Sequence, residues 1–186
     1  EGYVSDKEAS KTNFDTLLKD MQASTNEANE AREEAGYESI ELVGWATAPH
    51  YDAASHKLHW AEELEFAGDS AHTLNYNIRV LGRYGYLNLN SVGSMEQLPE
   101  IQAAIPDVLE SVAFTQGNRY EDFNKSTDRV AKYGIAALIA GGVLAKKGFF
   151  AIIIAVLAKS AKFIIIGVVA LGGVVTRMLG RGKSQA

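Results

Sequence analysis

The carboxy-terminal third of this 186-residue chain is apolar and holds no acidic residue. Lysines divide its apolar residues into three blocks, which are Tyr133–Ala145, Gly148–Ala158 and Phe163–Thr176. None reaches the roughly 20 residues that a helix needs to cross a bilayer. Lysines at the edge of a block extend its usable length, because their heads reach the lipid headgroups. The pattern predicts a membrane-embedded helical segment over residues 133–179.

The best single crossing in this segment is Phe163–Leu179, with Lys162 and Arg177 at its edges. Residues 180–186 add further positive charge, and positive residues stay on the cytoplasmic side of a membrane. We therefore expect a basic cytoplasmic tail over 180–186 and the rest of the chain on the opposite side.

The cationic residues of the segment have two possible roles. A lysine at mid-bilayer costs roughly 2.5–3.5 kcal/mol on insertion scales, so it lies at a membrane edge or faces the polar interior of an oligomer. The path of Tyr133–Ala158 stays open between one long helix and two short pieces that re-enter or lie at the interface. The residues concerned are Lys146, Lys147, Lys159, Lys162 and Arg177.

Small residues in the apolar blocks favour close packing of helices in a bilayer. They predict self-association, although a lone anchor is also rich in glycine. The candidate packing residues are Gly134, Gly141, Gly142, Gly167, Gly172 and Gly173. The partners expected from the sequence are the lipid bilayer and a second copy of the chain; a further protein partner stays unspecified.

Charge is divided unevenly along the chain. Residues 1–132 hold 23 acidic and 11 basic side chains, a net charge of −12, whereas 133–186 carry +7. Such a division indicates two environments. The acidic part argues against nucleic-acid binding, and the basic part suits anionic lipid. The absence of cysteine excludes disulfides and thiolate chemistry.

The sequence predicts an α+β domain over residues 1–116 and a linker to the membrane over residues 117–132. Asn13 is expected to cap a helix that ends near Gly36. Ser94 and Gln97 open a second helix, in which Pro106 predicts a kink. Strands are expected at Ile40–Ala46, Lys57–Phe66, Leu74–Val80 and Tyr86–Val92, and Val112–Thr115 is a possible short closing strand.

The alternation in these strands predicts a sheet with one face on a core and one in water. Trp45 and Trp60 are expected in the core, and Pro49 is expected to turn the chain. The fold class predicted is therefore α+β, a two-layer antiparallel sheet with flanking helices, followed by a helical membrane anchor.

Candidate chemical sites are weak. His50, Asp52, His56 and His59 could bind a metal, but His56 and His59 are three apart in or beside a strand and should face opposite sides. Asp52 and Glu62–Glu65 could supply a carboxylate pair, but no signature fixes a partner. We therefore predict no catalytic, cofactor or metal site.

Two surfaces could bind a partner. The Tyr- and Asn-rich stretch Tyr76–Asn90 could line a saccharide or peptide groove, although such residues more often form cross-strand pairs on a wet sheet face. The acidic run Glu27–Glu34 could be a partner-binding face, although a charge run is usually a solvated helix side.

Short motifs spread along almost the whole chain form a recognisable set. They are Glu1–Val4, Val43–Trp45, Pro49–Asp52, Thr73–Tyr76, Leu81–Gly82, Gly117–Tyr120, Asp122–Phe123, Ser126–Asp128 and Tyr133–Ala137. This set resembles a bacterial family of predicted membrane-anchored proteins of unknown function. Its members usually carry a signal peptide and an additional amino-terminal portion, so the chain looks like the carboxy-terminal portion of a longer product.

The resemblance implies an envelope protein in the bacterial inner membrane, with its domain outside the cytoplasm, and it implies no reaction. The sequence thus predicts a non-enzymatic, membrane-anchored protein that presents an α+β domain for assembly or partner binding. Two alternatives stay open, a homo-oligomeric channel with a lysine-lined interior and a ligand-binding or hydrolytic envelope domain.

Overall fold

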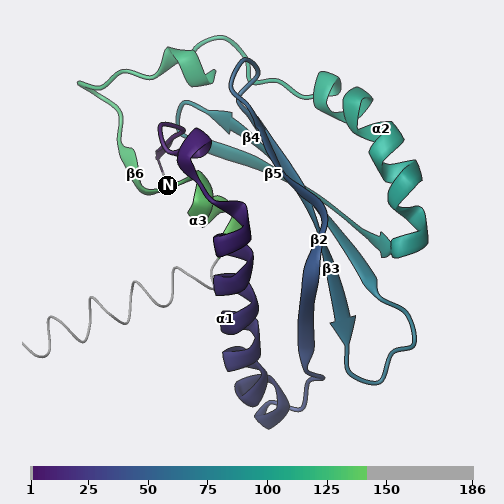
Figure 1. The fold of residues 1–186 in the computed structure, drawn as a ribbon. Coiled ribbons are helices and arrows are strands. Elements are labelled where there is room, and N and C mark those ends of the chain that lie inside the picture. The colour runs from purple at the N-terminus through teal and green to yellow at the C-terminus, as the bar shows by residue number, and fades with distance from the viewer. Residues whose placement is uncertain (1, 142–186) are drawn as a thin grey trace, which may run out of the picture. The chain divides into compact units, whose positions relative to one another are not determined.

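The computed structural model describes residues 2–141, and an antiparallel sheet of four strands forms their centre (Figure 1). The strands lie side by side in chain order. Because neighbours in the chain are neighbours in the sheet, each pair is joined by a short turn. The strands are β2 (Ile40–Asp52), β3 (Lys57–Phe66), β4 (Thr73–Gly82) and β5 (Gly85–Ser94). The α+β class predicted from the sequence is confirmed, as are the positions of β3, β4 and β5.

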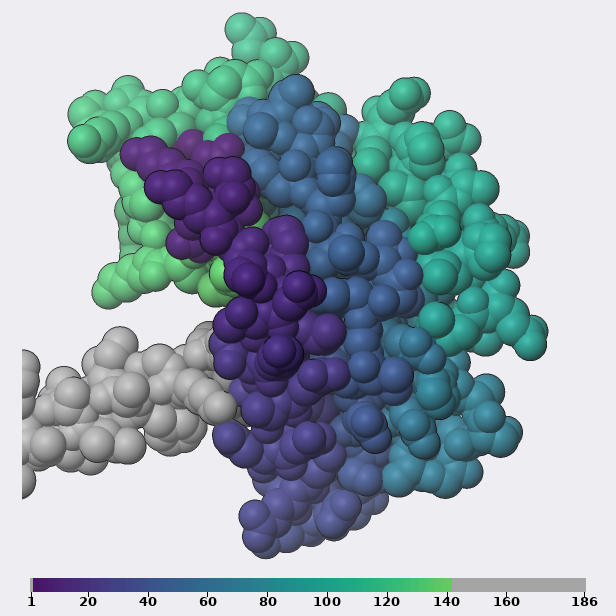
Figure 2. All heavy atoms as spheres, viewed as in Figure 1, coloured from purple at the N-terminus to yellow at the C-terminus, as the bar shows by residue number. Residues whose placement is uncertain are grey.

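Helix α1 (Phe14–Glu34) lies against one face of the sheet, alongside β2 (Figures 1 and 2). Its start is the predicted one, because Oδ1 of Asn13 accepts a hydrogen bond from the amide of Thr16 at 2.9 Å. Leu17 and Met21 are the buried apolar side chains of its inner stripe. The chain leaves the helix through Gly36, whose φ of 80° lies in the left-handed region that glycine adopts readily.

Helix α2 (Leu98–Ser111) covers the opposite face of the sheet (Figure 1). A short 3₁₀ turn, η2 (Met95–Gln97), precedes it, and Oε1 of Gln97 accepts from the amide of Ser94 at 3.0 Å. Ile105 is its most buried residue. Pro106 lies inside α2, and the helix continues past it to Ser111.

The sheet buries side chains on both faces, so the expectation of one wet face is wrong. Leu58 and Trp60 of β3 belong to the core that contains Leu17 of α1. Tyr76 and Ile78 of β4 belong to a second core that contains Ile105 of α2. Successive strand residues point to opposite faces, so a helix on each side gives β3 and β4 two buried sides.

Strand β2 runs beyond the expected end at Ala46 and includes Pro49. It is an edge strand, where a missing amide hydrogen breaks no ladder bond. Its pairing with β3 shifts register at three places, the last between Thr47 and His50. The extra residues of these irregularities accommodate the proline, so the chain turns only after Asp52.

The region expected to be a linker, 117–132, contains regular structure. It includes the 3₁₀ turn η3 (Tyr120–Asp122) and the start of β6 (Val130–Gly134). β6 pairs in parallel with β1 (Tyr3–Ser5), which precedes the 3₁₀ turn η1 (Ala9–Lys11). The possible strand at Val112–Thr115 does not form. The fold therefore extends past residue 116.

Helix α3 (Ile135–Ala140) ends the described part of the chain. Ile135, Leu138 and Ile139 are at most 4% exposed and pack in the core that contains Leu17 and Leu58. The beginning of the first apolar block is thus domain core. Among residues 2–141, no helix has the length and apolarity needed to cross a bilayer. The predicted crossing Phe163–Leu179 lies outside the described residues.

Candidate functional site

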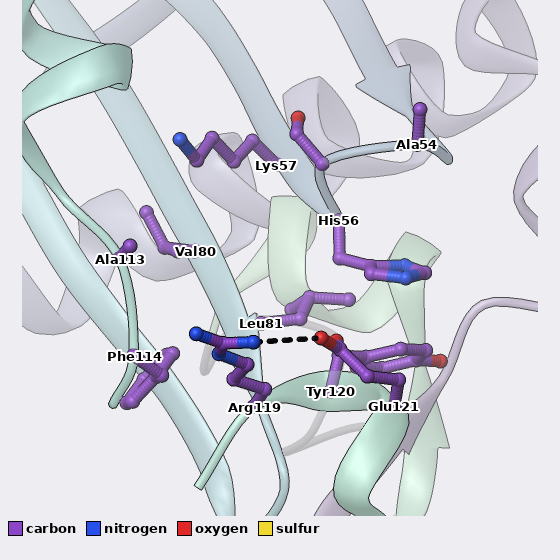
Figure 3. Close-up of a pocket in the computed structure, with 11 residues that line it drawn as sticks. Ala54, His56, Lys57, Val80, Leu81, Ala113, Phe114, Arg119, Tyr120 and Glu121 are labelled. Atoms are coloured by element: carbon purple, nitrogen blue, oxygen red, sulfur yellow. Dashed lines mark ion pairs between the residues drawn. The ribbon is translucent and has the colours of Figure 1, made fainter. Parts of the chain in front are cut away.

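A pocket of about 300 Å³ opens between the β2–β3 turn and the segment that follows α2 (Figure 3). His56 and Lys57 approach it from the turn, whereas Phe114, Arg119 and Tyr120 approach it from the segment. These two parts of the chain are far apart in sequence. The amide of Leu81 donates to the carbonyl of His56 at 2.9 Å, which fixes the turn against β4.

His56 is held in place by buried and half-buried polar and aromatic side chains. Its φ of 55° is unusual for a residue with a side chain. Its ring stacks on Tyr120 with the centroids 4.0 Å apart, and its Nδ1 lies 3.0 Å from the hydroxyl of Tyr51. That hydroxyl also donates to Oδ2 of Asp6 at 2.8 Å. Burial, and then the hydrogen bond to Asp6, raise the pKa of Tyr51, which therefore stays a protonated donor.

Tyr120 joins the segment that follows α2 to the amino-terminal residues Tyr3–Asp6. Its hydroxyl donates to the carbonyl of Val4 at 3.0 Å and accepts from the amide of Asp6 at 3.1 Å. Its ring also stacks on Tyr3 with the centroids 4.5 Å apart. Burial raises the pKa of Tyr120, so the phenol is protonated at neutral pH. Tyr120 therefore fastens β1 and η3 together.

The charged groups at the rim of the pocket are partly engaged already. The Nζ of Lys57 donates to the carbonyl of Leu109. Arg119 forms an ion pair with Glu121 at 4.0 Å (Figure 3). Two cations and an imidazole can hold a small anionic or carbonyl-bearing group, whereas the Tyr120 hydroxyl is already bonded to the backbone of Val4 and Asp6. Binding of such a group in the pocket competes with the existing pairs.

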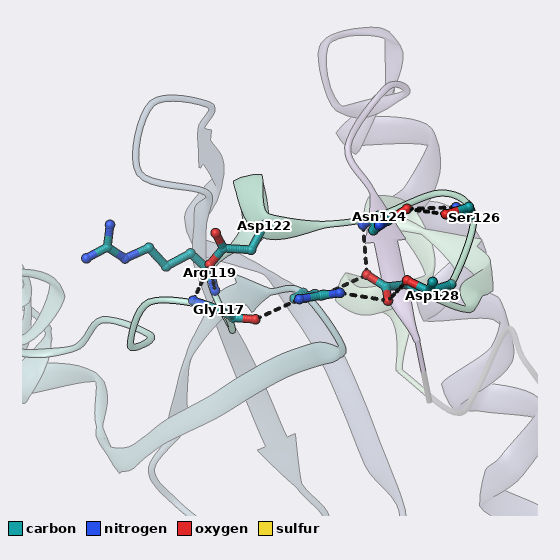
Figure 4. A network of polar contacts seen from close by, with 8 residues as sticks. Gly117, Arg119, Asp122, Asn124, Ser126 and Asp128 are labelled. Atoms are coloured by element: carbon teal, nitrogen blue, oxygen red, sulfur yellow. Dashed lines mark hydrogen bonds and ion pairs between the residues drawn. The ribbon is translucent and has the colours of Figure 1, made fainter.

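A second polar network fastens the 117–128 segment to the β4–β5 turn (Figure 4). Arg83 donates to Asp128 from Nε at 2.6 Å and from Nη2 at 3.1 Å, and its Nη1 donates to the carbonyl of Gly117 at 3.1 Å. Oδ2 of Asp122 accepts from the amides of Gly117 and Arg119 at 2.7 and 2.9 Å. The Arg83 guanidinium holds the pKa of Asp128 well below its usual range.

Four residues of this network, Gly117, Arg119, Asp122 and Asp128, lie in motifs that carried the family resemblance. The family described as "Protein of unknown function (DUF2167)" matches residues 1–172. The chain belongs to this family. No curated protein and no solved structure gives a significant match. In this DUF2167 chain, the motif residues Gly117, Tyr120 and Asp128 bond to other parts of the domain, and these bonds hold the segment that lines the pocket. Asp122 bonds within its own segment, to the amides of Gly117 and Arg119.

His56 and His59 of the DUF2167 chain point to opposite sides of the sheet, as predicted. His56 lies with Tyr120 on the side of α1, whereas His59 lies 3.0 Å from the hydroxyl of Tyr76 on the side of α2. His50 and His59 are neighbours, with ring centroids 5.4 Å apart. Burial, and then the charge of His50, lower the pKa of His59. No group of three or more metal-ligating side chains occurs within residues 2–141.

The Asn-rich strands bond mainly to one another. Glu62, nine-tenths buried, accepts from Nε1 of Trp60 and from Nδ2 of Asn75, each at 2.9 Å. Asn90 donates to the side chains of Asn75 and Asn77 at 2.7 and 3.0 Å. The guanidinium of Arg79 lies over the ring of Trp60 at 5.0 Å. These bonds engage most of the polar groups of Tyr76–Asn90. A pocket of about 200 Å³ also lies between this stretch and α2, lined by Tyr76, Leu89 and Asn90 on one side and by Ile101 and Ile105 on the other.

Two residues predicted to pack membrane helices lie in the described domain. Gly134 ends β6, and a Cβ there would collide with the carboxyl group of Glu8. Gly141 ends α3 with a φ of 61°. The other predicted packing glycines and all of the predicted membrane-edge cations lie outside the described residues. They are Gly142, Gly167, Gly172, Gly173, Lys146, Lys147, Lys159, Lys162 and Arg177.

Sequence reasoning missed the groups that organise this site. Asp6, Tyr51 and Tyr120 meet across more than a hundred residues, and Arg83 meets Asp128 across 45. Because these residues lie far apart in the chain, no local periodicity or fixed spacing in the sequence indicates that they are in contact. The available signal was the motif set itself, because it holds Tyr51, Tyr120 and Asp128 in three separate stretches.

Proposed function

We propose that this chain is a non-enzymatic, membrane-anchored envelope protein that presents its α+β domain for assembly or partner binding. The observation that supports this most is the direct junction between the fold and the apolar sequence. Helix α3 places its apolar side chains in the domain core and ends at Ala140. This helix lies within the first apolar block, Tyr133–Ala145, and the next block begins at Gly148, after only Lys146 and Lys147.

The charge distribution supports the same proposal and gives an orientation. The net charge of −12 over residues 1–132 suits a solvated domain, and the +7 beyond it suits an anionic leaflet. Positive residues after Phe163–Leu179 favour a cytoplasmic tail. The domain then lies on the extracytoplasmic side of a bacterial inner membrane.

Membrane fractionation tests the anchor. The full chain, expressed in a bacterium behind a cleavable signal sequence, is expected to stay in the membrane pellet after washing with high salt and with alkaline carbonate. Release by either wash would contradict the proposal. The double variant Val168→Asp and Val169→Asp should be released, because a carboxylate in the middle of a span is costly. Ala103→Asp on the exposed side of α2 is the matched control and should stay in the pellet.

A second candidate function, binding of a small ligand, is favoured by the pocket between His56 and Arg119. Its cationic rim suits a carboxylate or phosphate group. A screen of small anions for thermal stabilisation of the full chain tests this candidate. Stabilisation that Arg119→Gln abolishes supports it. No stabilisation by millimolar acetate, citrate or phosphate would reject it.

A further inference from the structure

Strand β5 is an edge of the sheet with no partner on its outer side among residues 2–141. Its ten residues, GYLNLNSVGS, include no charge and no proline. Its pairing with β4 is regular from Thr73–Ser94 to Gly82–Gly85, without a bulge. Proteins usually protect an exposed edge with charged residues, prolines or bulges, because its free amides and carbonyls bind other strands. β5 has none of these protections.

The opposite edge, β2, is protected in several ways. It contains Pro49 and shifts register at three places along its pairing with β3. Helix α1 also covers its backbone: Nε2 of Gln22 donates to the carbonyls of Leu42 and Val43 at 3.0 and 3.1 Å. Asn29 donates to and accepts from the backbone of Ile40, each at 2.9 Å. The same fold therefore closes one edge and leaves the other open.

The outer side of β5 is exposed to solvent. Leu87 is 40% exposed and Val92 is 66% exposed, which is unusual for apolar side chains in a strand. Asn88, Asn90 and Ser91 are exposed as well. Within residues 2–141, no side chain forms a hydrogen bond to the backbone of residues 87–93. An uncharged, regular strand of this length is a template for strand addition.

We infer that β5 pairs antiparallel with β5 of a second copy of this chain, which joins two four-stranded sheets into one. In an antiparallel pair of identical strands, each residue lies opposite a residue from the other half of the same sequence. The pairing is stable only if these opposed side chains are compatible. With Leu89 opposite Leu89 of the second copy, Leu87 lies opposite Ser91 on the same face. An apolar pair at the centre and two mixed pairs beside it then occupy the face on the side of α2.

The other face of the joined strands is also compatible in this register. Asn88 lies opposite Asn90 of the second copy, and their amides can bond to each other. Tyr86 lies opposite Val92, and a pair of an aromatic and a β-branched residue stabilises neighbouring strands. No charged side chain of β5 meets another, although the domains carry a large net negative charge. Because screening weakens the repulsion between the two domains, added salt should strengthen the pairing.

The inference goes beyond the proposed function and does not depend on the anchor, since the contact lies within the described domain. Disulfide trapping of the full chain in membranes or mild detergent tests it. The chain has no cysteine, so single-cysteine variants report one contact each. Opposed residues of paired strands have Cβ atoms about 5 Å apart, within reach of a disulfide after a small adjustment. In the proposed register the two Val92 residues are about 20 Å apart.

We therefore expect Leu89→Cys to form a disulfide-linked dimer on mild oxidation, and Val92→Cys to form little. Val43→Cys, on the protected edge β2, is the matched control and should also form little. Thermal denaturation shows whether each variant is folded. Equal crosslinking at positions 43, 89 and 92, or none at 89 in a folded variant, would overturn the inference. Dimers held together only by the apolar blocks would give the first of these results.

A charge test in the Leu89→Cys background checks the register. Leu87→Lys with Ser91→Lys places lysine opposite lysine at two positions and should reduce crosslinking about tenfold. Leu87→Lys with Ser91→Glu places lysine opposite glutamate and should restore it. Both pairs change the same exposed positions, so loss of folding cannot explain a difference between them. Equal crosslinking by the two double variants would contradict the register.

Discussion

Arg83 in the β4–β5 turn holds Asp128 through two hydrogen bonds, at 2.6 and 3.1 Å, so that the segment before β6 is fastened to the sheet. The side chain of Asp128 is only 3% exposed. The pair holds in place the 117–128 segment, which forms one wall of the pocket beside His56. Its removal should loosen that wall before it unfolds the sheet.

Asp128→Asn should lower the melting temperature at neutral pH and increase amide exchange over residues 117–128. The guanidinium of Arg83 lowers the pKa of Asp128, so the carboxylate stabilises the fold above the pKa of an unfolded aspartate, about 4. This stability is lost as the pH falls through the lowered pKa. The difference in melting temperature between the wild type and the variant should therefore be constant from pH 7 to about pH 5 and shrink as the pH falls further. Asp107→Asn, on the exposed side of α2, should change neither the melting temperature nor the amide exchange over residues 117–128.

Gly82→Ala should destabilise the domain by about 1–3 kcal/mol, because the site is overpacked. A Cβ on Gly82 would lie 2.7 Å from the ring of Phe114, which lines the pocket. Gly44→Ala is the control, since nothing lies within 4 Å of the added Cβ. Chemical denaturation of both variants measures the difference between their free energies of unfolding. Equal stability of the two would mean that Phe114 moves away freely.

Glu62→Leu should lower the free energy of unfolding by about 2–4 kcal/mol, because Trp60 and Asn75 both lose their acceptor. Burial raises the pKa of Glu62, so the charged form opposes folding above that pKa. Lowering the pH through this raised pKa neutralises Glu62 and so increases the stability of the wild type, an effect that the Glu62→Leu variant lacks. Denaturant titrations at several pH values measure both effects. Glu38→Leu on the exposed loop before β2 should leave stability nearly unchanged.

Asn29→Ala should cost about 1–2 kcal/mol and speed amide exchange at Ile40, because both hydrogen bonds to that residue are lost. Asn26→Ala, on the exposed side of the same helix, should be neutral or slightly stabilising, since alanine favours helix. Hydrogen exchange followed by mass spectrometry compares the exchange rate of the Ile40 amide in the two variants. Unchanged exchange at Ile40 would show that α1 does not protect the β2 edge.

The elements that could be predicted from the sequence are those specified by neighbouring residues. Asn13 caps α1 through the amide of Thr16, three residues away, and β3 to β5 follow their own alternation. The extension of β2 past Pro49 depends on its place at the edge of the sheet, which no local pattern contains. The burial of both sheet faces depends on where α2 folds back, which is also a matter of tertiary structure.

Helix α3 shows why the boundary of the domain was misplaced. Residues Ile135–Ala140 have the small apolar composition of a membrane helix, yet they are buried against α1 and β3. Periodicity cannot separate a short buried helix from the start of a membrane segment. The site was hidden for a related reason, since Asp6, Tyr51 and Tyr120 come from three distant stretches.

The most direct test of the membrane-anchored account is the accessibility of two single cysteines in intact bacterial cells with a permeable outer membrane. Ala103→Cys lies on the exposed side of α2, and Ser184→Cys lies in the basic tail. A membrane-impermeant maleimide should label position 103 in intact cells and position 184 only after the inner membrane is broken. Labelling of both positions in intact cells, or of position 184 alone, would contradict the account.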